Sequence, residues 1–275
     1  MRILIATGGS PHSDTALRLA TYILQTQNIT DRPTVMTVIK REAQRVRAER
    51  LLDQALEILR LDAPKVKTIV RVGHRVEQIV HEADRGNYDL LIIGERPVHR
   101  LLTRILGSTA RRVMEQAPCP VIIAKDEIGP IKRILVCDSG AESPSLLIPF
   151  KAKLAGLSQG PVELTILHVM SQMTAGPQVR GKQLRAGVEE LIREGAPEGY
   201  LLAQDIETLE SPGIYPQPKV RHGLVVDEIV AEARSGDYDL VVIGANRREG
   251  WQHFLLDNLA QQIVTKVRRP ILVMK

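Results

Sequence analysis

The most constraining feature of this sequence is an internal repeat. VRVGHRVEQIVHEADRGNYDLLIIG at residues 70–94 aligns without a gap with VRHGLVVDEIVAEARSGDYDLVVIG at residues 220–244. The positions that recur unchanged 150 residues later (220 − 70) include Arg71, Gly73, Val76, Ile79, Val80, Glu82, Ala83, Gly86, Tyr88, Asp89, Leu90, Ile93 and Gly94. At 275 residues the chain is long enough for two units of the same fold.

The repeat continues to both ends of the sequence. PVIIAK at residues 120–125 matches PILVMK at residues 270–275, again 150 positions apart (270 − 120). RILIATGG at residues 2–9 matches RILVCDSG at residues 133–140, only 131 positions apart (133 − 2). The second copy therefore carries an insertion, which we place near 171–217. Two tandem domains are predicted, 1–125 and 131–275, with the linker DEIGP at 126–130.

Each copy alternates strand and helix patterns. Short apolar or β-branched runs indicate buried strands, and apolar residues at helical spacing indicate helices between them. In the first copy we expect strands at 3–7, 34–39, 66–72, 89–93 and 121–124, with helices at 14–24, 42–61, 76–83 and 109–116. Such alternation favours an α/β fold with a parallel, doubly wound sheet in each domain. The insertion shows a helical pattern at 182–193, followed by the Gly- and Pro-rich segments GAPEGY and SPGIYPQP. We interpret SPGIYPQP as loop.

Composition narrows the classes of ligand and partner. The net charge of +5 is mild, and aromatic residues make up only 3% of the chain, which leaves few rings for stacking bases. We therefore do not expect a nucleic-acid partner, and we interpret Arg41, Arg45, Arg47 and Arg50 as a solvated helix face.

Cys119 and Cys137 lack metal-ligand spacing and are predicted to be reduced packing residues. Without a signal sequence or an 18-residue apolar run, we expect a cytoplasmic protein that contacts no membrane.

Two loops mark the candidate site. In an open α/β sheet, ligands bind outside the carboxyl ends of the strands, where the strand order reverses. TGGSPHS at 7–13 follows the first strand, and GERPVHRLLTRILGS at 94–108 follows the fourth. Glycines let backbone N–H groups approach phosphate, and a helix N-terminus favours negative charge. From spacing alone, Gly107-Ser108 is equally consistent with an anion site and with a plain turn in which Ser108 caps the helix.

These motifs carry a family resemblance. ILIATGGSPHSDTAL, HEADRGNYDLLIIG and the segment from Gly94 to Gly107-Ser108 followed by APCPVIIAK resemble the universal stress protein family, in the right order and in both copies. The resemblance implies two tandem flavodoxin-like, HUP-type domains, each with a five-stranded parallel sheet. It also implies that the last strands, 121–124 and 271–274, pair in an internal pseudo-dimer. Whether two such chains form a further homodimer is left open.

The family's nucleotide binders share the pattern G-x2-G-x9-G-[S/T] and an Asp near the end of strand one. Here Gly94, Pro97 and Gly107-Ser108 occupy the pattern, and Gly8 occupies the position of the Asp. Pro97 removes one N–H donor. Arg96 and Arg100 are equally consistent with supplying charge to a phosphate and with being exposed side chains on a mobile loop. The resemblance implies that ATP or AMP, with or without Mg²⁺, binds the first domain through Thr7, Gly8, Gly9, Ser10, Met36, Gly94, Arg96, Pro97, Arg100, Gly107, Ser108 and Thr109.

The second copy departs further from this pattern. Gly244 remains, but Arg247, Asp257 and Asn258 stand at the other aligned positions, and an acid at a phosphate site repels the ligand. We expect no nucleotide there, and we interpret Trp251 and Phe254 as an apolar patch or a partner surface.

Two functions of different classes remain open from the sequence. One is a stress-response regulator with an adenine nucleotide in the first domain. The other is a nucleotide-free scaffold for a protein partner that the sequence does not identify. No HExxH, GxSxG or nucleophile–base motif occurs, so we predict no catalytic residue, no resident metal site and at most weak ATP hydrolysis.

Overall fold

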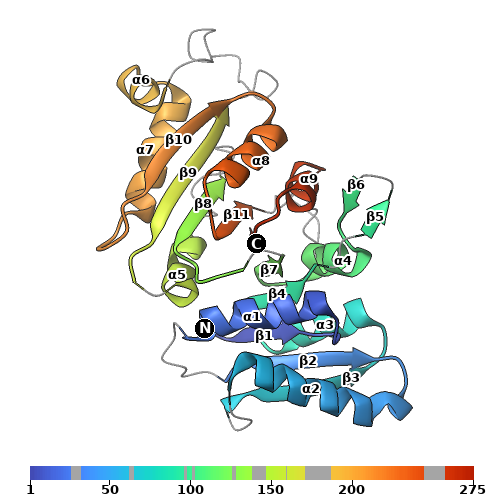
Figure 1. The fold of residues 1–275 in the computed structure, drawn as a ribbon. Helices are drawn as coiled ribbons and strands as arrows, with labels where there is room; N and C mark the ends of the chain where they lie inside the picture. The colour runs from blue at the N-terminus through green and yellow to red at the C-terminus, as the bar shows by residue number, and fades with distance from the viewer. Residues whose placement is uncertain are drawn as a thin grey trace.

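The computed structural model describes most of the chain. The described residues are 1–25, 32–61, 65–95, 98–100, 103–125, 128–137, 147–158, 160–170, 187–244 and 258–275, with side chains left out at 98–100 and 103–105. Figure 1 shows the two copies of the repeat side by side, joined through one continuous sheet.

The first copy forms five parallel strands with helices between them. The strands are β1 (Ile3–Ala6), β2 (Thr34–Ile39), β3 (Lys67–Val72), β4 (Leu90–Gly94) and β7 (Val121–Ala124). The helices are α1 (Pro11–Gln25), the short 3-10 helix η1 (Glu42–Gln44), α2 (Arg45–Leu59), α3 (Arg75–Arg85) and α4 (Ser108–Gln116). The expected strands and helices are all present, with ends that shift by a few residues.

The second copy repeats this arrangement. Its strands are β8 (Arg133–Cys137), β9 (Glu163–Met170), β10 (Gln217–His222), β11 (Leu240–Gly244) and β12 (Ile271–Met274). Its helices are α5 (Leu147–Leu157), α6 (Val188–Arg193), α7 (Pro197–Leu209), α8 (Val225–Ser235) and α9 (Asn258–Lys266). Among the described helices, α6 has no equivalent in the first copy. It packs on α7 through Leu191 and Ala196.

All ten of these strands lie in one sheet, in the order β10-β9-β8-β11-β12-β7-β4-β1-β2-β3. Within each copy the strands are parallel and follow the order 3-2-1-4-5. The predicted α/β fold of two doubly wound five-stranded sheets is therefore confirmed. The order is that of the first five strands of a Rossmann sheet, and it differs from the flavodoxin order, which is 2-1-3-4-5.

The last strands of the two copies meet in the middle of the sheet. β7 and β12 are antiparallel, and Ile122 lies opposite Leu272, its own counterpart 150 positions later (272 − 122). This confirms the expected pairing of 121–124 with 271–274. The two copies are thus related by an approximate twofold axis through this pair.

Helices cover both faces of the sheet. One core joins α1, α2, α5 and α7 to side chains such as Ile5 and Ile134, and the other joins α3, α4, α8 and α9 to side chains such as Leu4 and Leu135. Aliphatic side chains fill both cores, as the scarcity of aromatics requires. Cys119 and Cys137 are buried in the second core, which confirms that they are packing residues.

Several local expectations need correction. A two-stranded hairpin, β5 (Val98–Arg100) and β6 (Thr103–Ile105), lies inside the segment 94–108 and was not expected from its pattern. SPGIYPQP is loop only in part, because Gln217 and Pro218 begin β10. GAPEGY leads into α7, with Pro197 in the first turn, where its missing N–H is no loss. Ser108 does not cap α4, because Gly107 is the N-cap and Ser108 is the first helical residue. Residues 171–186, which include the start of the helix expected at 182–193, lie outside the described part.

Candidate functional site

The strand order places a switch point between β1 and β4. From β1 the chain moves outward through β2 to β3, then returns to β4 on the other side of β1. The loops that leave the carboxyl ends of β1 and β4 therefore separate toward opposite faces of the sheet, which is the usual position of a ligand crevice in such folds. Thr7–Ser10 leave β1, and Gly94 ends β4.

The loop after β1 is held by its own hydroxyl groups. Ser13 Oγ accepts hydrogen bonds from the N–H groups of Gly8 (3.1 Å) and Ser10 (3.4 Å), and it lies 2.9 Å from Ser10 Oγ. Thr7 Oγ1 accepts from the N–H of Gly9 at 3.3 Å. Gly9 has a φ of +65°, a left-handed conformation that favours glycine. The loop is therefore preformed, with a backbone that other residues would strain.

Met36 lies under this loop. It is fully buried in β2, and its carbonyl accepts a hydrogen bond from the N–H of Thr7 at 2.9 Å. The structure therefore brings Thr7, Gly8, Gly9, Ser10 and Met36 together.

Gly94 joins the two loops through packing. A Cβ atom at this position would lie 1.9 Å from the carbonyl oxygen of His12 and 3.0 Å from the backbone nitrogen of Ser13. The first turn of α1 is thus in direct contact with the end of β4, and only glycine permits that approach. Gly94 is required by the fold whether or not a ligand binds.

The rest of the predicted site is described only in part. Gly107, Ser108 and Thr109 open α4, so free N–H groups are present at that helix end. In the described part of the chain no hydrogen bond joins them to Gly8 or Gly94. Arg96 and Pro97 lie outside the described residues, and for Arg100 only the backbone, in β5, is described.

Sequence reasoning missed one basic residue at this site. Arg75 is the first residue of α3, and a Cβ atom at Gly8 would lie 4.0 Å from its Cζ and Nη2 atoms. Its guanidinium group therefore lies beside the loop after β1. The missed signal was its position at a helix start after a strand, one of the few places from which a side chain reaches a switch point.

A buried ion pair follows Gly94. Lys125 Nζ lies 3.4 Å from Glu95 Oε2, and both side chains are fully buried. Lys125 also donates to the carbonyl oxygens of Val264 and, at 2.7 Å, Val267, at the end of α9 in the other copy. Lys275, its counterpart, donates to the carbonyl oxygen of Met114 near the end of α4. Burial lowers the pKa of Lys275 to about 8.

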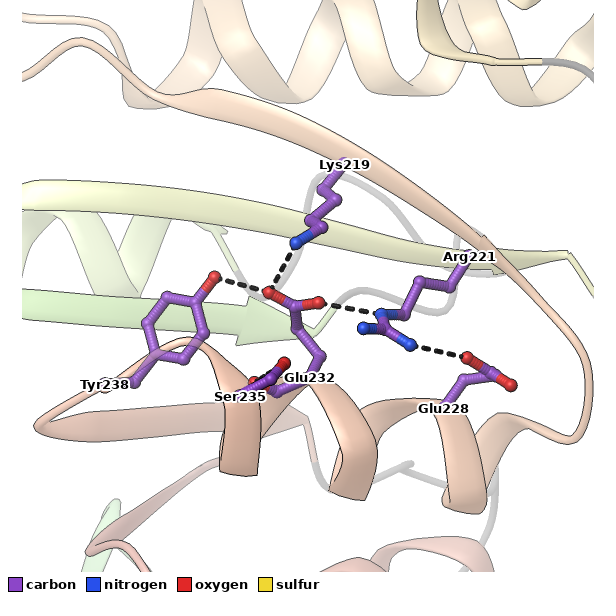
Figure 2. A network of polar contacts seen from close by, with 6 residues as sticks. All are labelled: Lys219, Arg221, Glu228, Glu232, Ser235 and Tyr238. Carbon is purple, nitrogen blue, oxygen red and sulfur yellow. Dashed lines mark hydrogen bonds and ion pairs between the residues drawn. The ribbon is translucent and has the colours of Figure 1, made fainter.

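An arginine, a glutamate and a tyrosine that recur in the repeat form a structural network in each copy, which Lys219 joins in the second. Figure 2 shows Lys219 and Arg221 of β10 directed at Glu232 of α8, at 2.8 Å and 2.7 Å, with the hydroxyl of Tyr238 donating to the same carboxylate at 2.8 Å. Burial opposes the charge of Glu232, but these hydrogen bonds outweigh it and lower its pKa. In the first copy Arg71 and Tyr88 contact Glu82 in the same way.

The second copy shows little of its own candidate site. Gly244 ends β11 and Asn258 begins α9. Arg247, Trp251, Phe254 and Asp257 lie outside the described residues, so the predictions made for them stay predictions.

Other candidate features lie away from the switch point. A hollow of about 580 Å³ between the carboxyl-terminal halves of α1 and α2 is lined by Arg18, Thr21, Tyr22, Gln25, Glu57, Ile58, Arg60 and Ile128, none of them an expected nucleotide contact. Over the described ranges, no three His, Cys, Asp or Glu side chains gather as a metal site. None of the described helices is long and apolar enough to cross a membrane.

The fold and the candidate site define a class: a tandem pair of doubly wound α/β domains, each with its switch point between the first and fourth strands. The model of the universal stress protein family matches residues 1–125 and again residues 130–275. The chain belongs to the universal stress protein family.

Individual relatives agree with this. Universal stress protein Slr1230 of Synechocystis sp. is 21% identical over 76% of this chain and 68% of its own length. Universal stress protein Rv2623 of Mycobacterium tuberculosis is 24% identical over 81% of this chain and 74% of its own. The crystal structure of a universal stress protein from Archaeoglobus fulgidus is 18% identical and covers 100% of this chain and 98% of its own, with a TM-score of 0.69, which supports the fold alone.

Proposed function

We propose that the first domain, residues 1–125, binds an adenine nucleotide, ATP or AMP, at its switch point, and that occupancy regulates a stress response. The second domain, which we place at 131–275 after the linker 126–130, binds none. The observation that carries this proposal is the preformed loop Thr7–Ser10, held by Ser13 beside Gly94 and the basic residue Arg75. The N–H groups at the start of α4 and the guanidinium group of Arg75 supply the donors that phosphate oxygens accept, because the N–H groups of Thr7–Ser10 already bond within the fold.

Calorimetric titration of ATP and of AMP into the full chain tests the proposal. We expect one nucleotide per chain. Gly107→Asp places a carboxylate at the start of α4 and is expected to abolish binding by like-charge repulsion. Asn258→Asp places the same group at the start of α9 and is the matched control, with no expected effect.

The alternative is a nucleotide-free scaffold that binds a protein partner. It is favoured by one observation: the contact of Gly94 with His12 explains that glycine without a ligand. Absence of heat at millimolar ATP and AMP would support the scaffold and reject the nucleotide site.

A further inference from the structure

The fold does not explain why Arg75 stands at the start of α3. Its counterpart in the second copy is Val225, which begins α8 in the same way, and the two helices have the same length of 11 residues. The positive end of the helix dipole lies at the N-terminus, so a cation in the first turn is unfavourable there. Arg75 therefore distinguishes the first copy from the second, and it opposes local helix stability.

No acidic group in the described structure neutralises Arg75. In its first turn, Glu77 lies 3.6 Å from His74, and further along α3 Glu82 pairs with Arg71. No ion pair or hydrogen bond joins Arg75 to another described residue, and its side chain is exposed. The guanidinium group is therefore available to an anion.

The position of this group is specific to the crevice. Arg75 follows β3, while Gly8 follows β1, and β2 lies between those two strands. The side chain thus crosses the carboxyl end of β2 to reach Gly8, which has no side chain to obstruct a ligand. The start of α4 lies after β4, on the other side of β1, so two groups that attract anions flank the switch point.

We propose that Arg75 selects a nucleotide that carries a second phosphate on its ribose, at the 2′ or 3′ position, in addition to its 5′-phosphate. This inference rests on the proposed function and names the ligand class of that site. A guanidinium group binds phosphate oxygens in pairs through charge-assisted hydrogen bonds. In dinucleotide sites of the same strand order, an acid binds the ribose hydroxyl groups and an arginine accommodates a ribose phosphate. The start of α4 then takes the 5′-phosphate.

Calorimetry on the full chain with three probes tests the inference: AMP, adenosine 3′,5′-bisphosphate and adenosine 2′,5′-bisphosphate. At least one bisphosphate is expected to bind roughly tenfold to a hundredfold more tightly than AMP, the range of a charge-assisted hydrogen bond. Arg75→Gln is expected to remove this preference, and Arg75→Lys to restore part of it. Arg85→Gln, at the other end of α3, is the matched control and should leave the preference intact.

Thermal unfolding separates selectivity from folding. Because Arg75 opposes the dipole of α3, the Tm of Arg75→Gln is expected to equal or exceed that of the wild type. If AMP binds as tightly as both bisphosphates, this inference is wrong and the proposed function stands. If none of the three binds while ATP does, the inference is wrong and the proposed function stands; if ATP does not bind either, both are wrong. A lower Tm with an unchanged preference would assign Arg75 a structural role and overturn the inference.

Discussion

At the residue scale, Glu232 and Gly94 are required by the fold for different reasons, one for the contacts of its side chain and the other for having no side chain. Glu232 has no exposed surface and accepts hydrogen bonds from Lys219, Arg221 and Tyr238. It holds an edge strand, β10, to the helix α8 (Figure 2). Gly94 contributes no side chain at all, and its role is to leave room for the first turn of α1.

Glu232→Gln is expected to destabilise the protein by about 1–3 kcal/mol, because the basic partners lose their charged acceptor while the site stays buried. Glu228→Gln is the control: Glu228 is 26% exposed at its side chain and has one ion pair, to Arg221, so a smaller loss is expected. Urea denaturation measures both. Equal losses would contradict a special role for the buried carboxylate.

The pH dependence of the same residue has a defined sign. The folded state lowers the pKa of Glu232 below its ordinary value of 4.5, so the unfolded state takes up the proton first as the pH falls. Its stabilising contribution is present above pH 4.5 and is lost as the pH falls through the lower folded value. Denaturation curves between pH 6 and pH 3 are expected to show a smaller acid loss in Glu232→Gln than in the wild type.

Gly94→Ala is expected to destabilise the fold by about 1–3 kcal/mol or more, because its Cβ would meet backbone atoms, which cannot rotate away. Gly129→Ala is the matched control, since nothing lies within 4 Å of a Cβ there. It should change stability by less than about 0.5 kcal/mol. A thermal shift of similar size in both variants would argue against the close contact.

At the element scale, the lysines that follow the two central strands connect the copies. Each donates to carbonyl groups near the C-terminus of a helix in the other copy, Lys125 at α9 and Lys275 at α4. A cation is favourable at a helix C-terminus. These are also the helices whose first turns belong to the two candidate phosphate sites. The two lysines differ in their neighbours. Lys125 is fully buried with Glu95, whereas the residue of the second copy that corresponds to Glu95 is Ala245.

Lys275 is expected to make stability rise with pH. Its pKa is about 8 in the folded state and 10.5 ordinarily, so between these values the unfolded state binds more protons. Cys119 acts oppositely, because burial raises its pKa from 9.0 to about 11. The Cys119→Ala variant removes this opposing contribution. In that variant, urea denaturation between pH 8 and pH 9.5 measures the rise in the free energy of unfolding that is due to Lys275. Adding Lys275→Met should remove it, and an identical rise in the double variant would reject the assignment.

At the scale of the whole molecule, the antiparallel pair of β7 and β12 makes one sheet of two repeats. Because Ile122 faces its own counterpart Leu272, the edge of one copy is nearly complementary to itself. An isologous dimer uses the same surface on both subunits. The tandem chain is therefore equivalent to a dimer with its two subunits joined covalently.

Residues 1–125 produced alone are expected to dimerise through β7, because the exposed edge would otherwise leave backbone groups and apolar side chains in water. Sedimentation equilibrium at tens of micromolar measures the mass. The full chain is the control, since β12 already covers that edge. A folded monomer of residues 1–125 would show that the backbone groups and apolar side chains at the edge of β7 do not require a second copy to cover them.

Much of this molecule could be predicted from the sequence because its elements repeat and carry strong local patterns. Strands such as 34–39 and 121–124 are continuous apolar or β-branched runs, and their bounds agree with the structure residue for residue. The hairpin at 98–105 was missed because VHRLLTRI has no turn signature of its own. The end of SPGIYPQP was wrongly predicted as loop, because Gln217 and Pro218 begin the edge strand β10, a position in which proline is tolerated.

By itself the sequence determined the family, the two doubly wound sheets and the meeting of 121–124 with 271–274, because periodicity and the internal repeat are properties of the chain read in one dimension. It also located the loops of the candidate site. Only the tertiary structure decided what the recurring residues do: Glu232, Arg221 and Tyr238 hold a helix to an edge strand. It likewise revealed Arg75 beside Gly8, since those two residues are 67 positions apart (75 − 8) and meet only because two parallel strands end at the same edge of the sheet.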